Sequence, residues 1–311
     1  MPCQYFDLLA SDAKERPHSN VMLRNLSDGA KGSLCMIAAG LLMTIQDAIS
    51  KSLTTDFHPG EIMFFRGLFT FVPIIMIIAM RSGGIEQLVS RNLKGTLVRA
   101  ILGGATSIFV VISFIYLPLA DALAIIFVSP IILTALSSPL LGERVGWRRW
   151  LAVFVGFTGL LMMVRPSGEG IPFFYFFPLF TALLSALRDV ATRRLRNDDS
   201  AVSILFYSML AGVLIGAITM PVFGAQWPSS VQWGLLACAG ILNSLSHLLA
   251  IQALLLAPGG TMAPFRYLSL VWAVVIGYAV WGDVPDALKL TGGMLVVGAG
   301  LFILHRELRS R

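Results

Sequence analysis

Long apolar runs separated by short polar connections make up the chain after residue 30. A helix needs about 20 apolar residues to cross the hydrocarbon core of a bilayer. On that measure the pattern predicts ten membrane spans, at roughly 32–53, 60–80, 95–116, 119–141, 149–165, 172–193, 202–223, 231–255, 260–281 and 287–305. The expected fold class is therefore an all-α integral membrane protein with ten transmembrane helices.

The composition agrees with a membrane protein and excludes other classes. The chain is 56% hydrophobic and 13% charged, unlike an ordinary soluble domain. Its net charge of +6 does not indicate nucleic acid, because the basic residues lie in short loops, where membrane topology explains them better. Cys3, Cys35 and Cys238 have no metal-type spacing and predict no disulfide framework. Residues 1–30 lack a sustained apolar core, which predicts a polar cytoplasmic tail rather than a signal peptide.

The loop Lys and Arg residues predict the orientation, because cytoplasmic loops carry an excess of both. With the N-terminus in the cytoplasm, only Lys51, Arg165 and Lys289 fall at outer ends. The inner segments hold a much larger set: Lys14, Arg16, Arg24, Lys31, Arg81, Arg91, Lys94, Arg99, Arg144, Arg148, Arg149, Arg193, Arg194, Arg196, Arg306, Arg309 and Arg311. We therefore expect both termini to be cytoplasmic, in a plasma (bacterial inner) membrane.

An internal repeat divides the chain into two related halves. The segment 40–53 returns as 182–195, and the segment 141–145 returns more weakly as 281–284. Five spans per half is an odd number, so the second half is expected to enter the membrane from the opposite side. Inverted halves with a substrate site between them are common in secondary transporters. The expected boundaries are a first repeat at 31–166, a second at 171–306 and a cytoplasmic C-terminus at 307–311.

The stretch from Leu119 to Pro166 carries recognisable motifs. These are Ala-Asp-Ala at the start of the fourth span, a mid-helix Pro130, and Gly142-Glu143 at its exit. Together with Phe64-Phe65-Arg66-Gly67 in the second span, they make the chain closely similar to the EamA family of the drug/metabolite transporter superfamily. The resemblance implies transport activity and a central cavity lined mainly by spans 1, 3, 4, 6, 8 and 9. It leaves the substrate open, since relatives carry amino acids, vitamins, nucleotide-like metabolites and drugs.

Charged residues inside spans are costly and often functional. Asp47 lies near the outer end of the first span, with Lys51 one turn further on, and Arg66 lies near the outer side of the second span. We expect these three residues to form an outer charge cluster. The alternative is that Asp47 and Lys51 form an intrahelical pair that snorkels at a helix end.

The repeat predicts a matching inner cluster. Asp189 aligns with Asp47 and Arg193 with Lys51, while Arg188 adjoins them and Arg266 lies about six residues into the ninth span. Our hypothesis is that the two clusters are alternating gates that close the cavity on one side at a time. Arg66 and Arg266 lie too deep to reach water easily, so each is expected to hold a structural ion pair or a substrate carboxylate or phosphate.

Polar and aromatic residues of other spans are candidates for substrate contact. Asn243 and His247 are four residues apart and hence on one helix face; the alternative is hydrogen bonding that only joins helices. Pro130 is expected to kink the fourth span. The full set of candidates is Arg266, Tyr267, His247, Asn243, Phe114, Tyr116, Phe127 and Ser129.

Function is best weighed by class. The sequence holds no HExxH, no GxSxG and no acid-rich metal motif, so an enzyme is not expected, nor is a cofactor or metal. We predict a secondary active or facilitative transporter for a small polar metabolite, such as riboflavin or another heterocycle. The alternatives are an exporter of amino acids, carboxylates or S-adenosylmethionine-like metabolites, and a membrane-embedded structural or receptor protein. The expected partners are a small-molecule substrate and the lipid bilayer, with a homodimer left open and no nucleic acid.

Overall fold

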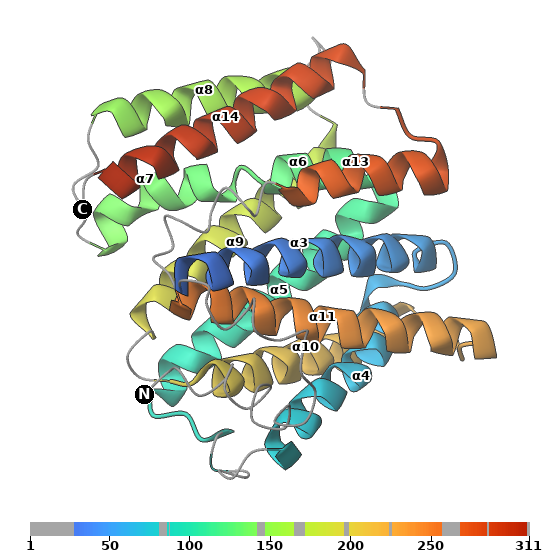
Figure 1. Ribbon diagram of the computed structural model, residues 1–311. Coiled ribbons are helices and arrows are strands. Elements are labelled where there is room, and N and C mark those ends of the chain that lie inside the picture. The colour runs from blue at the N-terminus through green and yellow to red at the C-terminus, as the bar shows by residue number, and fades with distance from the viewer. Residues whose placement is uncertain are drawn as a thin grey trace, which may run out of the picture.

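The computed structural model describes residues 28–80, 86, 88–141, 147–164, 172–195, 199–223, 226–256, 268–284 and 286–309. In these ranges the chain forms a bundle of helices (Figure 1). The helices are α3 (Asp28–Leu53), α4 (Pro59–Met80), α5 (Leu93–Tyr116), α6 (Leu119–Ile126), α7 (Ser129–Leu141), α8 (Trp147–Val164), η2 (Phe173–Tyr175), α9 (Phe176–Arg194), α10 (Ala201–Phe223), α11 (Ser230–Leu256), α13 (Leu268–Trp281) and α14 (Ala287–Arg309).

Six helical segments of the described residues are long and apolar enough to cross a membrane. They lie in α3, α4, α5, α9 with the preceding η2, α10 and α11. Shorter apolar helices occupy parts of the remaining predicted spans, at Leu119–Leu133, Phe154–Met163, Leu268–Trp281 and Ala287–Ala299. Large apolar side chains such as Ile75, Ile218 and Phe154 are exposed on the outer surface of the bundle. An integral membrane protein explains that surface, because lipid tails can cover it.

The fourth predicted span is broken in the middle. α6 ends at Ile126, Phe127 and Val128 form a turn, and α7 begins at Ser129. Pro130 explains the break, because proline has no backbone N–H and its ring clashes with the carbonyl four residues earlier. The expected kink of this span is therefore confirmed.

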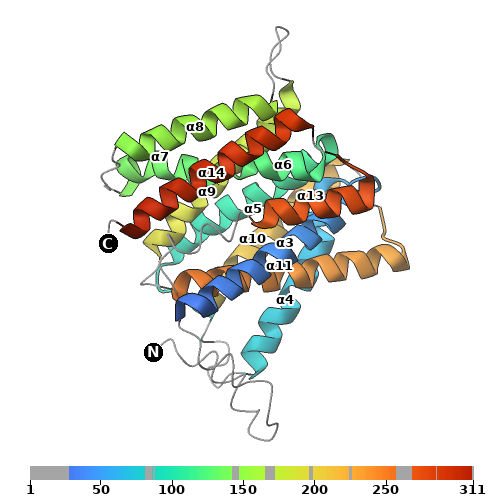
Figure 2. The same ribbon diagram turned by 45° about the horizontal axis from the view of Figure 1, so that its top comes forward.

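The helices pack in pairs that are far apart in the sequence. α3 lies along α11, α4 crosses α10, α5 packs on α9, and α8 packs on α14 (Figures 1 and 2). Glycines allow several of these close approaches. A Cβ at Gly216 of α10 would lie 2.6 Å from the Phe64 backbone nitrogen of α4, and a Cβ at Gly240 of α11 would lie 2.3 Å from the Arg66 carbonyl. Such small-residue contacts are the usual means of bringing helices together in membranes.

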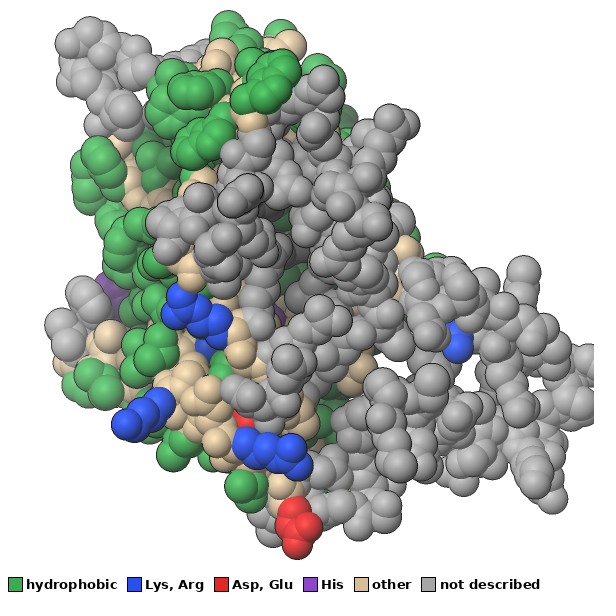
Figure 3. Space-filling model, turned by 90° about the vertical axis from the view of Figure 1, so that its left-hand side faces the viewer, with side chains coloured by type: hydrophobic (Ala, Val, Ile, Leu, Met, Phe, Trp, Pro, Cys, Tyr) green, Lys and Arg blue, Asp and Glu red, His purple; other side chains and the backbone are tan. Residues whose placement is uncertain are grey.

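The end of the bundle at which α3 begins and α14 ends carries basic side chains (Figures 1 and 3). Arg91 and Lys94 are exposed there, at the start of α5. Asp199, from the connection between α9 and α10, accepts hydrogen bonds from Ser90 Oγ at 2.6 Å, the Arg91 N–H at 2.6 Å and Thr96 Oγ1. This carboxylate therefore ties the start of α5 to the connection of the second half.

Candidate functional site

A polar cavity lies between helices of both halves. Its volume is about 40 Å³, room for only a few water molecules. The lining side chains come from α4, α5, α9, α10 and α11: Met63, Arg66, Gly67, Thr70, Arg99, Gly103, Ser107, Arg188, Leu205, Ser208, Met209, Gly212, Val213, Asn243, His247 and Ile251. Three arginines thus meet one cavity inside a membrane protein. A metabolite-sized ligand requires these helices to separate, because such ligands occupy hundreds of cubic ångströms.

Arg66 reaches the cavity from α4 and is bound to α3. Its side chain is 6% exposed. Nη1 donates to Gln46 Oε1 at 2.6 Å and to Ser50 Oγ at 2.9 Å. The Gln46 amide in turn donates to the Asp47 carboxylate. Asp47 and Arg66 therefore belong to one buried network, which Gln46 bridges.

The expected third member of the outer cluster lies elsewhere. The Lys51 ammonium donates to the carbonyls of Leu117 at 2.8 Å and Phe114 at 3.2 Å, where α5 ends. It also lies 5.4 Å from the centre of the Trp281 ring at the end of α13, within cation–π range. Lys51 therefore donates to carbonyl groups at the end of a helix, which have no partner within that helix and attract a cation.

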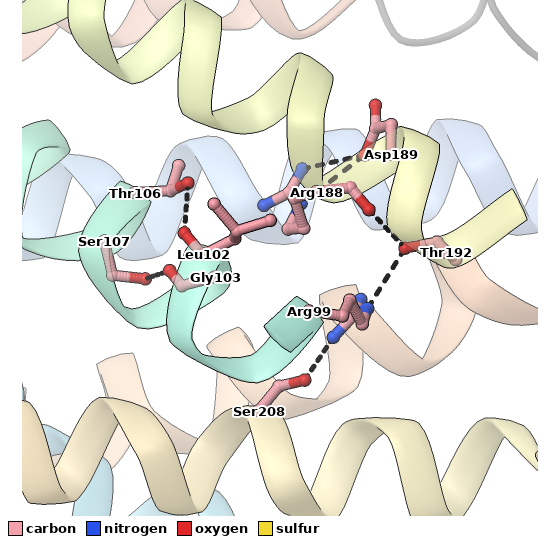
Figure 4. Close-up of polar contacts among 9 residues, drawn as sticks. All are labelled: Arg99, Leu102, Gly103, Thr106, Ser107, Arg188, Asp189, Thr192 and Ser208. Carbon is pink, nitrogen blue, oxygen red and sulfur yellow. Dashed lines mark hydrogen bonds and ion pairs between the residues drawn. The ribbon is translucent and has the colours of Figure 1, made fainter. Parts of the chain in front are cut away.

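Arg99 enters the cavity from α5 and links three helices (Figure 4). Its Nε donates to Thr192 Oγ1 of α9 at 3.1 Å, and its Nη1 donates to Ser208 Oγ of α10. Thr192 Oγ1 in turn donates a hydrogen bond to the Arg188 carbonyl oxygen, at an O–O distance of 2.8 Å. Both acceptors of Arg99 are neutral hydroxyls.

Arg188 lines the same cavity from α9 and pairs with its neighbour Asp189. The Nη2–Oδ1 distance is 3.3 Å. The inner cluster is therefore present in part. The side chain of Arg193 and both Arg266 and Tyr267 lie outside the described residues.

Asn243 and His247 share the cavity wall contributed by α11, as their spacing predicts. The other candidates are placed differently. Phe114 is 1% exposed in an apolar core that Phe127 packs against. Tyr116 is 49% exposed and stacks 5.7 Å from Phe177. Ser129 is buried where α7 begins. The structure does not bring these four residues to the cavity.

The resemblance implied a cavity lined by spans 1, 3, 4, 6, 8 and 9, but the described lining residues come from spans 2, 3, 6, 7 and 8. Gly67 of α4 and Gly212 of α10 supply the physical reason. Gly67 lets α10 approach closely, since a Cβ on it would lie 2.4 Å from Val213 Cγ2, whereas nothing lies within 4 Å of a Cβ built on Gly212. Polar groups of the two helices therefore border the cavity directly.

Three candidate residues escaped sequence reasoning. Arg99 was counted among the inner loop cations, but it is 6% exposed and lies inside α5. Asp121 of α6 and Lys289 of α14 form an ion pair at 2.5 Å. Asp121 stands in the Ala-Asp-Ala motif, which was the available signal. No sequence signal joins it to Lys289, because the pair depends on packing between distant helices.

One family model and a solved structure match this chain over nearly its whole length. The model of the EamA-like transporter family matches residues 30–165 and again residues 172–305. A crystal structure with 17% sequence identity superposes with a TM-score of 0.66, covering 90% of this chain and 99% of the other. At this identity the superposition supports the fold alone.

Curated relatives carry several transport activities. A Rickettsia conorii S-adenosylmethionine uptake transporter is 28% identical, over 92% of this chain and 97% of its own length. A Pseudomonas aeruginosa pseudopaline exporter is 27% identical, over 86% and 94%. A Rhizobium johnstonii riboflavin transporter is 25% identical, over 89% and 92%. The relatives are transporters rather than enzymes, and their substrates differ.

Proposed function

The chain belongs to the EamA-like transporter family, and we propose that it is a secondary active or facilitative transporter. It moves a small polar metabolite across the plasma (bacterial inner) membrane by alternating access. The observation that carries this proposal is the arginine-lined cavity between helices of both halves. Ionisable groups inside a membrane protein usually mark a substrate or ion pathway. The small volume of the cavity suits a closed state between two open ones.

The helix pairing supports ten spans in two inverted halves. In Figures 1 and 2, α3 and α9, the first long helix of each half, run in opposite directions. α3 packs on α11 and α9 packs on α5, which is the same first-with-third pairing seen from either half. α4 with α10 and α8 with α14 pair equivalent helices. A two-fold axis in the membrane plane would generate this set of contacts.

Polar contacts at the two ends of the bundle are candidate gates. At the expected outer end, the Lys289–Asp121 ion pair joins α14 of the second half to α6 of the first. Lys51 lies nearby, since Asp121 and Asp283 both act on its charge. At the expected inner end, Arg188 pairs with Asp189, and Asp199 ties α5 to the α9–α10 connection. We propose that these contacts break in alternation during transport.

Two substrate classes deserve a direct comparison. The relatives named above include transporters of riboflavin and of S-adenosylmethionine. A heterocycle such as riboflavin is the first candidate from sequence, and carboxylate-bearing metabolites such as amino acids or S-adenosylmethionine are the second. The three cavity arginines favour the second class, because guanidinium groups bind carboxylates through paired hydrogen bonds. Uptake and export both occur among the relatives, so the proposal includes no direction.

Transport by purified protein in liposomes tests this function. Liposomes preloaded with unlabelled S-adenosylmethionine, riboflavin or a mixture of amino acids are supplied with the same compound in labelled form, with and without a proton gradient. We expect counterflow of at least one compound well above that of protein-free liposomes. If the full-length protein, reconstituted in both orientations, moves none of the panel, the proposal is wrong.

A further inference from the structure

The three arginines of the cavity differ in their charge balance. Arg66 lies close enough to Asp47 for each charge to act on the other. Arg188 is paired with Asp189 at 3.3 Å. Arg99 instead donates hydrogen bonds from Nε and Nη1 to the hydroxyl groups of Thr192 and Ser208. Among the described residues, no carboxylate forms an ion pair with Arg99.

The position of Arg99 makes this difference important. Its side chain is 6% exposed, and it lies about 9 Å along α5 from the start of the helix, at 1.5 Å per residue. A buried cation in a membrane protein is costly unless a counter-charge accompanies it. Arg188, on the adjacent helix, adds positive charge beside Arg99, and its effect outweighs the opposing effect of the Asp189 carboxylate. A negatively charged group is therefore favoured at this point of the cavity.

The hydroxyl contacts prepare the guanidinium for such a group. Thr192 and Ser208 hold it from α9 and α10 and fix its plane (Figure 4). No described residue accepts a hydrogen bond from Nη2, which remains for a ligand. A fixed guanidinium loses less conformational freedom when it binds an oxyanion, and its planar fork matches a carboxylate.

Small residues leave room beside Arg99. Gly103 lies one turn further along α5, and a Cβ there would only just touch Arg188, at 3.7 Å from Cδ. Gly212 of α10 has open space on its cavity side, and Ser107 and Ser208 add short hydroxyl side chains. Separation of the helices would therefore open space next to the guanidinium.

We propose that Arg99 binds an oxyanion of the transported metabolite, a carboxylate or a phosphate, with Arg188 as the second cation of the site. This inference rests on the proposed transport function and assigns its substrate class. Asn243 and His247 of α11 line the same cavity and contact the remainder of the molecule. A neutral metabolite cannot supply the charge that Arg99 lacks.

Paired probes test the proposal on the purified full-length protein. Binding is measured by isothermal titration calorimetry for S-adenosylmethionine against its decarboxylated form, and for riboflavin 5′-phosphate against riboflavin. We expect the wild type to bind the member that carries the carboxylate or phosphate group about tenfold more tightly in one of the pairs. The first pair identifies a carboxylate site, and the second identifies a phosphate site. The preference should fall to within about twofold in Arg99→Gln and be intermediate in Arg99→Lys.

Controls separate binding from folding and from the broader function. Lys94→Gln removes an exposed cation from the same helix and should leave the preference unchanged. If Arg99→Gln fails to fold, as judged by its melting curve, Arg99→Lys and the wild-type preference carry the test. Equal binding of both members of each pair by the wild type overturns the proposal, as does an unchanged preference in Arg99→Lys and Arg99→Gln. Counterflow of a neutral solute in that case preserves the transport function, whereas no counterflow at all defeats it.

Discussion

Asp199 holds the connection between α9 and α10 against the start of α5. Partial burial acts to raise the pKa of its carboxyl group, but hydrogen bonds from Ser90, Thr96 and the Arg91 and Asn92 N–H groups outweigh it and hold the pKa below its ordinary value. The native state therefore binds a proton at this group less readily than the unfolded chain does. The same contact joins the two halves at the expected inner end.

A lowered pKa makes this contact dependent on pH. Its stabilisation is complete above the ordinary aspartate pKa of about 3.9 and is lost as the pH falls through the lower native value. At pH 7 we expect Asp199→Asn to lower the melting temperature of the purified protein by about 2 °C. The difference from wild type should shrink in melting curves recorded towards pH 3. Glu86→Gln, at an exposed position, is the control, and a loss that stays constant with pH would contradict the assignment.

Lys51 shows which residue-scale features the sequence can predict. Its place at the end of α3 follows from the hydrophobic pattern. Its partner does not, because the i,i+4 spacing from Asp47 and the carbonyls at Leu117 and Phe114 both satisfy an ammonium. The carbonyls belong to α5, and only the packing of α3 against that helix end brings them within reach. Spacing rules describe one helix at a time, so they cannot decide between these partners.

At the scale of elements, the crossing of α4 and α10 borders the cavity. Gly216 permits backbone contact at one end of the crossing, against Phe64 and Gly60. Gly212, one turn earlier, faces the cavity instead. These two glycines, four residues apart in α10, therefore differ in effect: Gly216 allows close packing, and Gly212 leaves open space at the cavity. The break after α6 could be predicted because Pro130 acts locally, whereas this crossing depends on two distant helices.

The crossing makes Gly216 intolerant of a side chain. A Cβ at this position would meet the Phe64 nitrogen at 2.6 Å and the Gly60 carbonyl at 3.0 Å, and backbone atoms cannot turn away as a side chain can. We expect Gly216→Ala to destabilise the protein by about 1–3 kcal/mol, the usual cost of overpacking. Thermal unfolding in detergent measures the effect. Gly234→Ala, where nothing lies within 4 Å, is the matched control, and equal melting temperatures for the two variants would refute the packing argument.

At the scale of the whole molecule, the ion pair between Asp121 and Lys289 lies where the halves meet at the expected outer end. Asp121 is 6% exposed. Lys289 donates to its Oδ2 at 2.5 Å, so the contact is a charged hydrogen bond as well as an ion pair. Truncating one partner removes the ion pair of the other, which favours any conformation that exposes the remaining charge to water.

Breaking this pair should open the outer side of the transporter. Ser107, which lines the cavity, is replaced by cysteine in a protein freed of its natural cysteines, and labelling by a membrane-impermeant maleimide is measured from outside. We expect Lys289→Met to increase the labelling rate several-fold, by shifting the population towards the outward-open state. The exchange of charges in Asp121→Lys with Lys289→Asp should restore the slow rate. Lys94→Met serves as the control, and unchanged labelling in Lys289→Met would exclude a gating role.

The sequence by itself determined the membrane class, the broken fourth span, the internal repeat and the family. Each follows from local hydrophobicity, from one proline or from similarity along the chain, none of which needs contacts between helices. Only the tertiary structure shows that Arg66, Arg99 and Arg188 line one cavity. It also shows that Lys51 donates to a carbonyl at the end of α5 rather than pairing with Asp47, and that Asp121 pairs with Lys289. A hydrophobic stretch of sequence predicts only that a helix crosses the membrane. Their rotation and neighbours depend on where small residues let backbones meet, and those positions choose which buried charges come together.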